Sequence, residues 1–311
     1  MSRYQWVPSW AELPPAPRGW MHSGIALLDG EIVVAHAGEP TLLWYGEGGD
    51  LRRSVPVPGL LELHGFEVVP DGLWIADIGS KRRPRGAEFE TRRGDGRVVL
   101  VDRDGAIRRE LHDPGRGWSP TAVAHVAESG DLWVADGYGQ QLVHRFDAAG
   151  RHLLTLSGEE GAGRFSCPHC VAVDRRRGDP ELYVADRANG RLQVYDLEGR
   201  FRRVAGAGVL VTPADLAFVR EQLVLTDYTR ARLTILDGDD TFVEHVGEDP
   251  QAPTRDGWPN ARDQRGDLVP PPLVPGRFNS PHTLAADGGG DLYVTEWLLG
   301  GRLTKWQRVA A

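Results

Sequence analysis

The chain has 311 residues, with 44 acidic and 36 basic side chains and a formal net charge of −8. This acidic balance argues against a nucleic-acid-binding surface, which depends on clustered Lys and Arg. No stretch approaches the roughly 20 apolar residues that span a bilayer, and the first residues lack the apolar segment of a secretory signal. The two cysteines, Cys167 and Cys170, form no disulfide framework, so the sequence predicts a cytoplasmic protein without membrane or nucleic-acid partners.

One sequence unit recurs along the chain: an alternating apolar strand, a Gly/Asp turn and a second strand that closes on an acidic residue. In chain order the copies fall at 23–36, which is degenerate, and at 63–77, 120–136, 168–186, 213–227 and 281–296. A third strand follows the unit, as at 97–105, 141–150, 191–199 and 232–240, and a D-X-X-G turn precedes a fourth. Four short antiparallel strands repeating every roughly 40 to 50 residues are typical of a propeller blade. The sequence therefore predicts an all-β fold, a six-bladed β-propeller in a single domain over 1–311.

The ends of the chain and two long spans depart from the period. The last copy ends too early for a complete fourth strand, so residues 4–13 are expected to supply one and close the ring. Residues 80–96 lengthen a loop of blade 2 and carry six basic side chains, whereas residues 248–277 separate blades 5 and 6 and contain seven prolines. Both spans are either tolerated surface insertions or binding loops.

Histidines occupy one equivalent position on alternate blades. Position one of the first strand reads, in chain order, Gly24, His64, Thr121, His169, Ala214 and His282. Alternate blades of a sixfold ring are about 120° apart, so His64, His169 and His282 should point at one spot at the mouth of the channel. Three neutral imidazoles with an open fourth position predict a metal site, with zinc first and copper, iron or nickel as alternatives.

Residues just past the second strands should reach the same rim. They are Tyr138, Arg187, Tyr228 and Trp297. Tyr138 and Arg187 belong to adjacent blades that flank His169. Because a neighbouring arginine and metal favour the phenolate, Tyr138 is a candidate general base and Arg187 its partner, the alternative for Tyr138 being an ordinary turn residue.

The segment Cys167-Pro168-His169-Cys170 has the spacing of a dithiol redox centre or half a zinc knuckle. A redox pair requires a helix amino terminus to lower its thiol pKa, but this segment leads into a β-strand. Redox chemistry is therefore disfavoured. Strand alternation turns Cys170 away from the channel, and whether Cys167 contacts the metal stays open.

Taken together, these motifs resemble the catalytic domain of peptidyl-α-hydroxyglycine α-amidating lyase, a six-bladed propeller of the NHL-repeat type. The matching segments are LHG (63–65), PTAVA (120–124), DGYG (136–139), FSCPHCVAV (165–173), VADRANGRLQVY (184–195) and FNSPHTLAA (278–286). The resemblance implies that His64, His169 and His282 are the zinc ligands. It likewise implies that Tyr138 is the catalytic tyrosine and Arg187 the active-site arginine.

The reaction implied by this resemblance cleaves an N-substituted α-hydroxyglycine into an amide and glyoxylate. Two departures bear on it. Ala37 stands where the family has a second arginine, and Thr283 stands where it has an acidic residue associated with a structural calcium. These substitutions leave the substrate and the calcium open.

The leading functional hypothesis is a metal-dependent lyase that acts on a small α-hydroxy amide or a related hydroxylated molecule. Arg82, Arg83 and Arg85 of the basic loop are expected to favour an anionic substrate. Two alternatives remain: a metal-dependent hydrolase of the lactonase type, which would use carboxylate and Asn ligands, and a non-catalytic propeller that serves as a binding scaffold. The sequence does not identify a protein partner.

Overall fold

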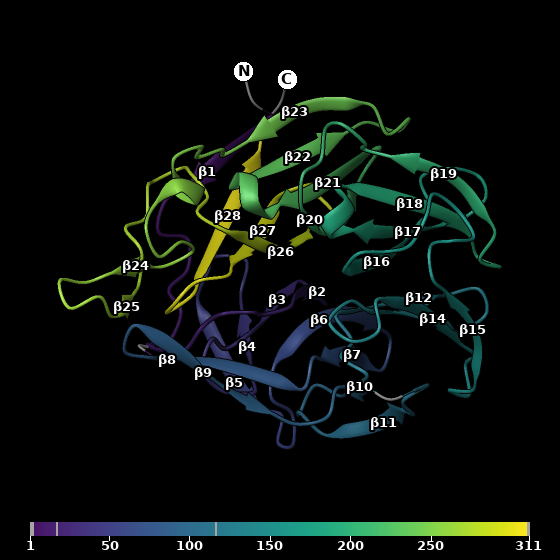
Figure 1. Cartoon of the computed structure of the whole chain (residues 1–311), viewed down its shortest axis with the longest axis horizontal. Helices are drawn as coiled ribbons and strands as arrows, with labels where there is room; N and C mark the ends of the chain where they lie inside the picture. The colour runs from purple at the N-terminus through teal and green to yellow at the C-terminus, as the bar shows by residue number, and fades with distance from the viewer. Residues whose placement is uncertain (1–2, 17, 116, 310–311) are drawn as a thin grey trace.

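A computed structural model describes residues 3–16, 18–115 and 117–309. Across these ranges the strands form six four-stranded antiparallel sheets arranged as blades around a central axis (Figure 1). The all-β, six-bladed prediction is confirmed.

Each blade runs outward from an innermost strand. Blade 1 comprises β2 (Ile25–Leu28), β3 (Glu31–Ala35), β4 (Thr41–Tyr45) and β5 (Leu51–Pro56). Blade 2 comprises β6 (Leu63–Val69), β7 (Gly72–Asp77), β10 (Arg97–Val101) and β11 (Ile107–Leu111). Blade 3 comprises β12 (Ala122–Val126), β13 (Asp131–Asp136), β14 (Leu142–Phe146) and β15 (His152–Leu156).

Blades 4 to 6 follow the same order. Blade 4 comprises β16 (Pro168–Asp174), β17 (Glu181–Asp186), β18 (Arg191–Asp196) and β19 (Phe201–Ala205). Blade 5 comprises β20 (Pro213–Val219), β21 (Gln222–Asp227), β22 (Arg232–Leu236) and β23 (Phe242–Val246). Blade 6 comprises β26 (Pro281–Ala286), β27 (Leu292–Glu296), β28 (Arg302–Arg308) and β1 (Tyr4–Val7). Short 3₁₀ turns are η1 (Arg187–Asn189), η2 (Tyr228–Arg230) and η3 (Ala252–Thr254).

The second strands are buried because each lies between two neighbouring blades. Every residue of β7, β13 and β21 is buried, as expected for strands covered on both faces. Large side chains such as Trp133 and Tyr183 fill the space between blades. Removing this apolar surface from water supplies the main favourable term of folding.

The ring is closed by the amino-terminal strand. β1 pairs antiparallel with β28, with Tyr4 opposite Arg308, and so completes the last blade. The expected closing strand is therefore confirmed for Tyr4–Val7. The outer edge of blade 6 is formed by a segment from the opposite end of the chain, which ties the two ends together.

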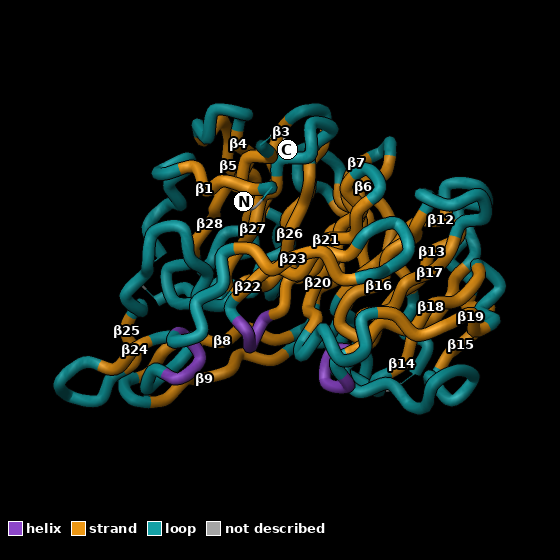
Figure 2. Tube along the Cα trace, turned by 90° about the horizontal axis from the view of Figure 1, so that it is seen from above, coloured by secondary structure: helices purple, strands orange, loops and turns teal. Residues whose placement is uncertain are grey.

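Both insertions lie on the same side of the disc (Figure 2). Residues 80–96 form a hairpin of β8 (Ser80–Arg85) and β9 (Glu88–Arg93), and the second insertion holds η3, β24 (Ala261–Arg262) and β25 (Leu268–Val269). The two insertions meet, since the Leu268 amide donates to the Gly86 carbonyl at 2.9 Å and Arg262 donates to the Ala87 carbonyl at 3.0 Å. Within the described ranges, no helix is long and apolar enough to cross a membrane.

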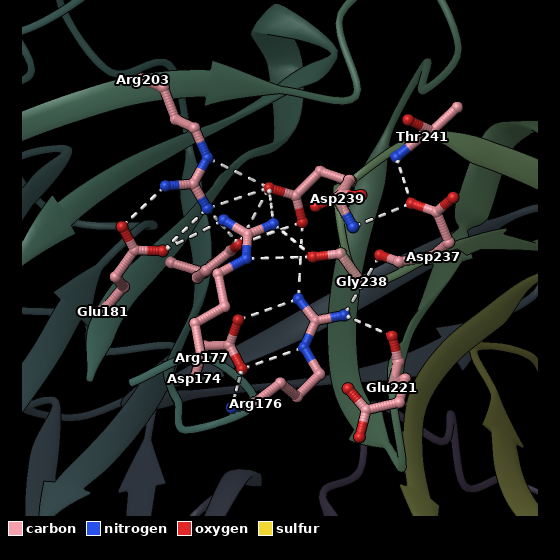
Figure 3. A network of polar contacts seen from close by, with 12 residues as sticks. Asp174, Arg176, Arg177, Glu181, Arg203, Glu221, Asp237, Gly238, Asp239 and Thr241 are labelled. Carbon is pink, nitrogen blue, oxygen red and sulfur yellow. Dashed lines mark hydrogen bonds and ion pairs between the residues drawn. The ribbon is translucent and has the colours of Figure 1, made fainter. Parts of the chain in front are cut away.

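An ion network joins blades 4 and 5 at the carboxyl end of β16 (Figure 3). The Arg176 guanidinium donates to both oxygens of Asp174 at 2.9 Å, and it also reaches the Glu221 carbonyl at 3.2 Å and the Asp237 carbonyl at 3.3 Å in blade 5. The side chain of Arg176 is 5% exposed and that of Asp174 only 1%. A buried ion pair with several further hydrogen bonds of this kind fixes how one blade sits on the next.

Arg176→Ala should therefore lower the free energy of unfolding by about 3–5 kcal/mol, because it leaves the buried Asp174 carboxylate without its partner. Arg175→Ala is the matched control. Arg175 is adjacent in sequence, but its pair with Glu128 is exposed, so we expect a loss of at most about 1 kcal/mol. Urea denaturation of the two variants measures the difference, and equal losses would contradict the assigned role of the network.

Candidate metal centre

Each of the three sequence-predicted histidines lies on a β-bulge at the start of an innermost strand. The pairing of β6 with β7 skips His64, that of β16 with β17 skips His169, and that of β26 with β27 skips His282. A bulge inserts one unpaired residue and re-aims its side chain. The same bulge occurs at Ala214 of blade 5, so on blades 2, 4 and 6 this local feature directs an imidazole toward the axis.

The three imidazoles form a nearly equilateral triangle. Ring centroids are 4.9 Å apart for His64 and His169, 4.9 Å for His64 and His282, and 5.1 Å for His169 and His282. All three residues are buried, at 1–2% exposure. The geometry expected from alternate blades of a sixfold ring is thus present.

Backbone carbonyls orient two of these rings. Nδ1 of His64 lies 2.7 Å from the Thr121 carbonyl, and Nδ1 of His169 lies 2.6 Å from the Ala214 carbonyl. Since a carbonyl oxygen can only accept, each Nδ1 carries the hydrogen and each Nε2 keeps a lone pair. Such hydrogen bonds from the ring nitrogen that does not bind the ion are a regular feature of metal-binding histidines.

The site favours neutral imidazoles. Burial lowers the pKa of His64 to about 3 and lowers the pKa values of His169 and His282 well below the ordinary range. Among the described residues, Nε2 of His64 and both ring nitrogens of His282 have no hydrogen-bond partner. Buried lone pairs without partners are costly in a folded protein unless something binds them. These residues could hold a metal ion.

A fourth histidine, His22, belongs to the same cluster. One ring nitrogen from each of His22, His64, His169 and His282 can be chosen so that all four lie within 4.8 Å of one another. Sequence reasoning missed His22 because it precedes the first strand of the degenerate blade 1 and falls outside the repeat register. Its position just before Ser23-Gly24, the start of that copy, was the available signal.

Tyr138 and Arg187 meet directly at the histidine cluster. Tyr138 follows β13 and Arg187 begins η1 after β17, so adjacent blades supply the pair. A guanidinium nitrogen of Arg187 donates to the Tyr138 hydroxyl at 3.1 Å, and the hydroxyl lies 2.9 Å from Nε2 of His169. Burial raises the pKa of Tyr138, and Arg187 offsets part of that effect. Arg187 thus favours the phenolate against the effect of burial, as the sequence led us to expect, and the stronger influence expected there was that of a nearby metal.

The cluster separates two spaces. On one side is a cavity of about 890 Å³, whose lining includes His22, His282, Tyr138 and Arg187. On the other side, His64 and His169 line the central channel, which has a volume of about 200 Å³. A ligand entering from the cavity would thus meet the tyrosine, the arginine and the histidines together.

An aromatic row crosses the cavity rim between the two insertions. Trp258 of the second insertion contacts Tyr228, with centroids 5.0 Å apart, Tyr228 contacts Trp297 at 5.6 Å, and Trp297 stacks on Trp20 at 5.1 Å. Trp20 then meets Phe89 of the β8–β9 hairpin at 5.7 Å. Tyr228, Trp297 and Trp20 also line the cavity.

The basic hairpin does not act as one patch. Arg82 and Arg93 line the cavity, whereas Arg83 pairs with Glu39 at 3.2 Å outside the cavity lining, and Arg85 is also absent from that lining. The expectation that Arg82, Arg83 and Arg85 act together at the site is corrected to Arg82. The physical reason is strand alternation in β8, which turns Arg83 to the other face.

Lys81 has a role that the sequence did not suggest. Its side chain is 5% exposed, pairs with Glu62 at 2.7 Å and donates to the Trp20 carbonyl at 3.1 Å. It therefore ties the hairpin to the segment that carries His22.

The two cysteines are free thiols. Cys170 is buried in the apolar core of blades 3 to 5. Cys167 is half-buried, and its carbonyl accepts a hydrogen bond from the Arg187 amide at 3.2 Å. Burial raises the pKa of both thiols, Arg187 offsets part of that effect at Cys167, and no α-helix starts at either cysteine among the described residues, all of which argues against a redox pair.

Glu67 of β6 lies in the channel below the cluster. Burial raises the pKa of Glu67 to about 7, and the hydrogen bond from the His125 amide and the charge of Arg175 offset part of this effect. The thiol of Cys170 is also near enough for the Glu67 charge to raise the pKa of that thiol. Between the unfolded value near 4.5 and this folded value, the folded chain keeps a proton that the unfolded chain has lost. Its contribution to the free energy of unfolding therefore falls as the pH rises through that window.

Glu67→Gln should remove this pH dependence. Relative to wild type, the free energy of unfolding of the variant should rise by about 1–2 kcal/mol between pH 5 and pH 8, less than the full shift implies because the Glu67 side chain is only partly buried. Urea titrations at several pH values measure it. Glu47→Gln, at an exposed position of blade 1, serves as the control and should show no such gain. A parallel pH profile for wild type and Glu67→Gln would contradict the assignment.

Comparison with known proteins agrees with this architecture. The family model of the NHL repeat matches residues 165–195, which contain His169 and Arg187. The chain is therefore a six-bladed β-propeller in which one segment of blade 4 matches the NHL repeat. It is 31% identical over 189 residues to NHL repeat-containing protein 3 of Mus musculus, covering 54% of this chain and 49% of that protein.

The propeller is also similar to amidating enzymes. It is 32% identical over 148 residues to peptidyl-alpha-hydroxyglycine alpha-amidating lyase 1 of Drosophila melanogaster, covering 42% of this chain and 25% of that protein. With peptidyl-glycine alpha-amidating monooxygenase of Mus musculus it shares 30% identity over 139 residues, or 42% and 13% of the two chains. The chain spans at most half the length of these curated relatives.

Among solved structures, a Bacteroides thetaiotaomicron protein matches with a TM-score of 0.65 and 15% identity, covering 97% of this chain and 71% of that one. A streptogramin B lyase matches with a TM-score of 0.56 and 11% identity, covering 98% and 97%. These likenesses concern the fold alone. The relatives and the histidine cluster together fit a lyase-like propeller.

Proposed function

We propose that this protein is a metal-dependent lyase that cleaves the C–N bond of a small α-hydroxy amide or a related hydroxylated molecule. The observation that carries the proposal is the triangle of His64, His169 and His282 with the Tyr138–Arg187 pair against it, at the floor of a cavity. Similarity to hydroxyglycine amidating lyases supports the reaction class.

The residues fit a transition-metal ion. Buried, neutral imidazoles with lone pairs lacking partners are the donor set that zinc, copper, iron and nickel accept. Zinc is our first choice, held by His64, His169 and His282. When bound, the ion would act as a Lewis acid that lowers the pKa of the substrate hydroxyl.

The protein groups would then handle the proton. Tyr138 lies beside His169, so its oxygen is placed to take the hydroxyl proton of a substrate at the cluster. Arg187 donates to that same oxygen and would stabilise negative charge there. As the hydroxyl oxygen forms a carbonyl, the C–N bond breaks and its electron pair leaves with nitrogen, which takes up one proton. The products are an amide and an aldehyde, with no net gain or loss of protons.

The cavity suggests the shape of the substrate. The aromatic row of Trp20, Trp297 and Tyr228 offers an apolar surface, and Arg82 and Arg187 supply positive charge on the same lining. An anionic small molecule with an apolar group matches both features. A carboxylate on the hydroxyl-bearing carbon, as in an N-acyl α-hydroxyglycine, would meet this requirement.

Arg82→Ala should raise KM for such an anion by about 5- to 20-fold and leave KM for a neutral analogue nearly unchanged, because one charge-assisted contact is lost. Arg85→Ala, in the same hairpin but outside the cavity lining, is the control and should behave as wild type. Steady-state kinetics on the two substrates provide the test. Equal effects on both substrates would refute the role of Arg82.

Incubation of zinc-loaded protein with an N-acyl α-hydroxyglycine tests the proposed function. We expect stoichiometric glyoxylate and amide, activity lost on chelation and restored by zinc. Turnover that depends on calcium, with lactone hydrolysis, would favour the hydrolase alternative. A protein that binds no metal and turns over no such compound would favour a binding scaffold.

A further inference from the structure

His22 lies on the cavity side of the histidine triangle, over the edge between His64 and His282. Its ring centroid is 4.4 Å from that of His64 and 4.6 Å from that of His282. Blade 1, which His22 precedes, sits between blades 6 and 2 in the ring, and these blades carry His282 and His64. The fourth imidazole thus comes from the segment that leads into blade 1, between the blades that carry His282 and His64.

The backbone hydrogen bond that orients His64 and His169 is missing at His282. His64 and His169 each donate from Nδ1 to the carbonyl at the equivalent position of the next blade, Thr121 and Ala214. By the same rule His282 would donate to Gly24 of blade 1, but neither ring nitrogen of His282 has a partner in the described structure. The residue that packs against His282 from blade 1 is His22.

Hydrogen-bond accounting fixes where His22 keeps its lone pair. Before an ion binds, His169 donates from Nδ1, so its Nε2 accepts the single proton of the Tyr138 hydroxyl, a contact that an ion on this Nε2 would replace. Nε2 of His22 lies 3.1 Å from that same hydroxyl oxygen and must therefore be the donor in that contact. The free lone pair of His22 is then on Nδ1.

We propose that His22 is a fourth protein ligand, so that the centre is a four-imidazole site. This inference rests on the metal centre in the proposed function and specifies its donor set. Four ring nitrogens that all lie within 4.8 Å of one another are close enough to converge on one ion, with the rings drawing inward to reach the roughly 2.0–2.1 Å of metal–imidazole bonds. A residue that binds through Nδ1 would also keep its Nε2 hydrogen on the Tyr138 oxygen.

The proposal has a consequence for metal choice. Four protein nitrogens fill the shell of a tetrahedral ion, so zinc would have to expand to five-coordination before it could accept a substrate oxygen. An ion that accepts five or six ligands, such as nickel, cobalt or ferrous iron, retains open positions with all four imidazoles bound. Turnover should accordingly be faster with such an ion than with zinc.

The test counts imidazoles on the bound ion. X-ray absorption spectra of the nickel-loaded full chain should give four imidazoles for wild type and three for His22→Ala. Competition titrations should show at least a 100-fold loss of nickel affinity in His22→Ala, since second-shell changes alone cost about 10- to 100-fold. Adding free imidazole to His22→Ala should restore the fourth ligand and most of the affinity, which separates a lost ligand from a damaged fold.

His36→Ala is the matched control. His36 is a half-buried histidine of the same blade, and its Nδ1 accepts only the Gly38 and Glu39 amides. It should leave both affinity and imidazole count unchanged. Three imidazoles in wild type, with less than a 10-fold change in His22→Ala, would overturn this inference and leave the three-histidine centre standing. Failure of wild type to bind nickel or zinc would overturn the centre itself and this inference with it.

Discussion

Tyr138→Phe is expected to lower kcat by about 10²- to 10⁴-fold on an N-acyl α-hydroxyglycine, while metal content and fold are preserved. The substitution removes only the hydroxyl that lies 2.9 Å from His169 and accepts from Arg187 at 3.1 Å. It leaves the aromatic ring in place, so packing around the cluster is little changed. Because the proton transfer is proposed for the chemical step, KM should change much less than kcat.

Tyr228→Phe provides the comparison. Tyr228 lines the same cavity and belongs to the aromatic row, but it makes no hydrogen bond to the described histidine cluster. Its loss of a hydroxyl should cost less than about fivefold in kcat, as expected for a group outside the proton transfer. If the two Phe variants lose activity equally, or if Tyr138→Phe matches wild type, Tyr138 is not the base.

His169→Ala should weaken metal binding by about 10²- to 10³-fold. The binding free energy of a protein metal site is shared among a few ligands, each contributing roughly 3 kcal/mol. Metal that binds only the folded state should also raise the thermal unfolding midpoint of wild type, and more so at higher metal concentration. This rise should vanish in the variant. Isothermal titration and thermal melts with and without zinc measure both effects.

His144→Ala distinguishes loss of a ligand from loss of any buried histidine. His144 lies on β14, is 3% exposed and bonds Thr155 at 2.9 Å, away from the cluster. It should lower stability without changing metal affinity. A comparable drop in affinity for both variants would show that His169 acts only through the fold.

The arrangement of the three histidines could be anticipated because it follows from periodicity. Once the repeats are aligned, His64, His169 and His282 share one register on alternate blades, and sixfold symmetry brings them together. The residues after the second strands, Tyr138 and Arg187, share a rim for the same reason. A regular ring converts sequence position into position in space.

Features that break the repeat could not be anticipated in this way. The bulges that aim the three imidazoles depend on local pairing between strands, which the residue pattern alone does not specify. His22 precedes the register, so no equivalent position exists to compare it with.

The basic hairpin shows a further limit. The sequence gives Lys81, Arg82 and Arg83 as neighbouring charges, but tertiary contacts send them to a buried pair with Glu62, the cavity and Glu39 respectively. Likewise, the contact of Leu268 with Gly86 joins two insertions that are far apart in the chain, and neither insertion has a repeat to place it.

The most direct test of the central claim is anomalous diffraction from crystals of the metal-loaded protein, collected on both sides of the absorption edge of the added ion. We expect one strong peak inside the triangle of His64, His169 and His282, with metal–nitrogen distances of about 2.0–2.1 Å and the Tyr138 oxygen beside the same ion. The absence of a peak there at saturating metal, or a peak bound by fewer than three of these imidazoles, would contradict the account.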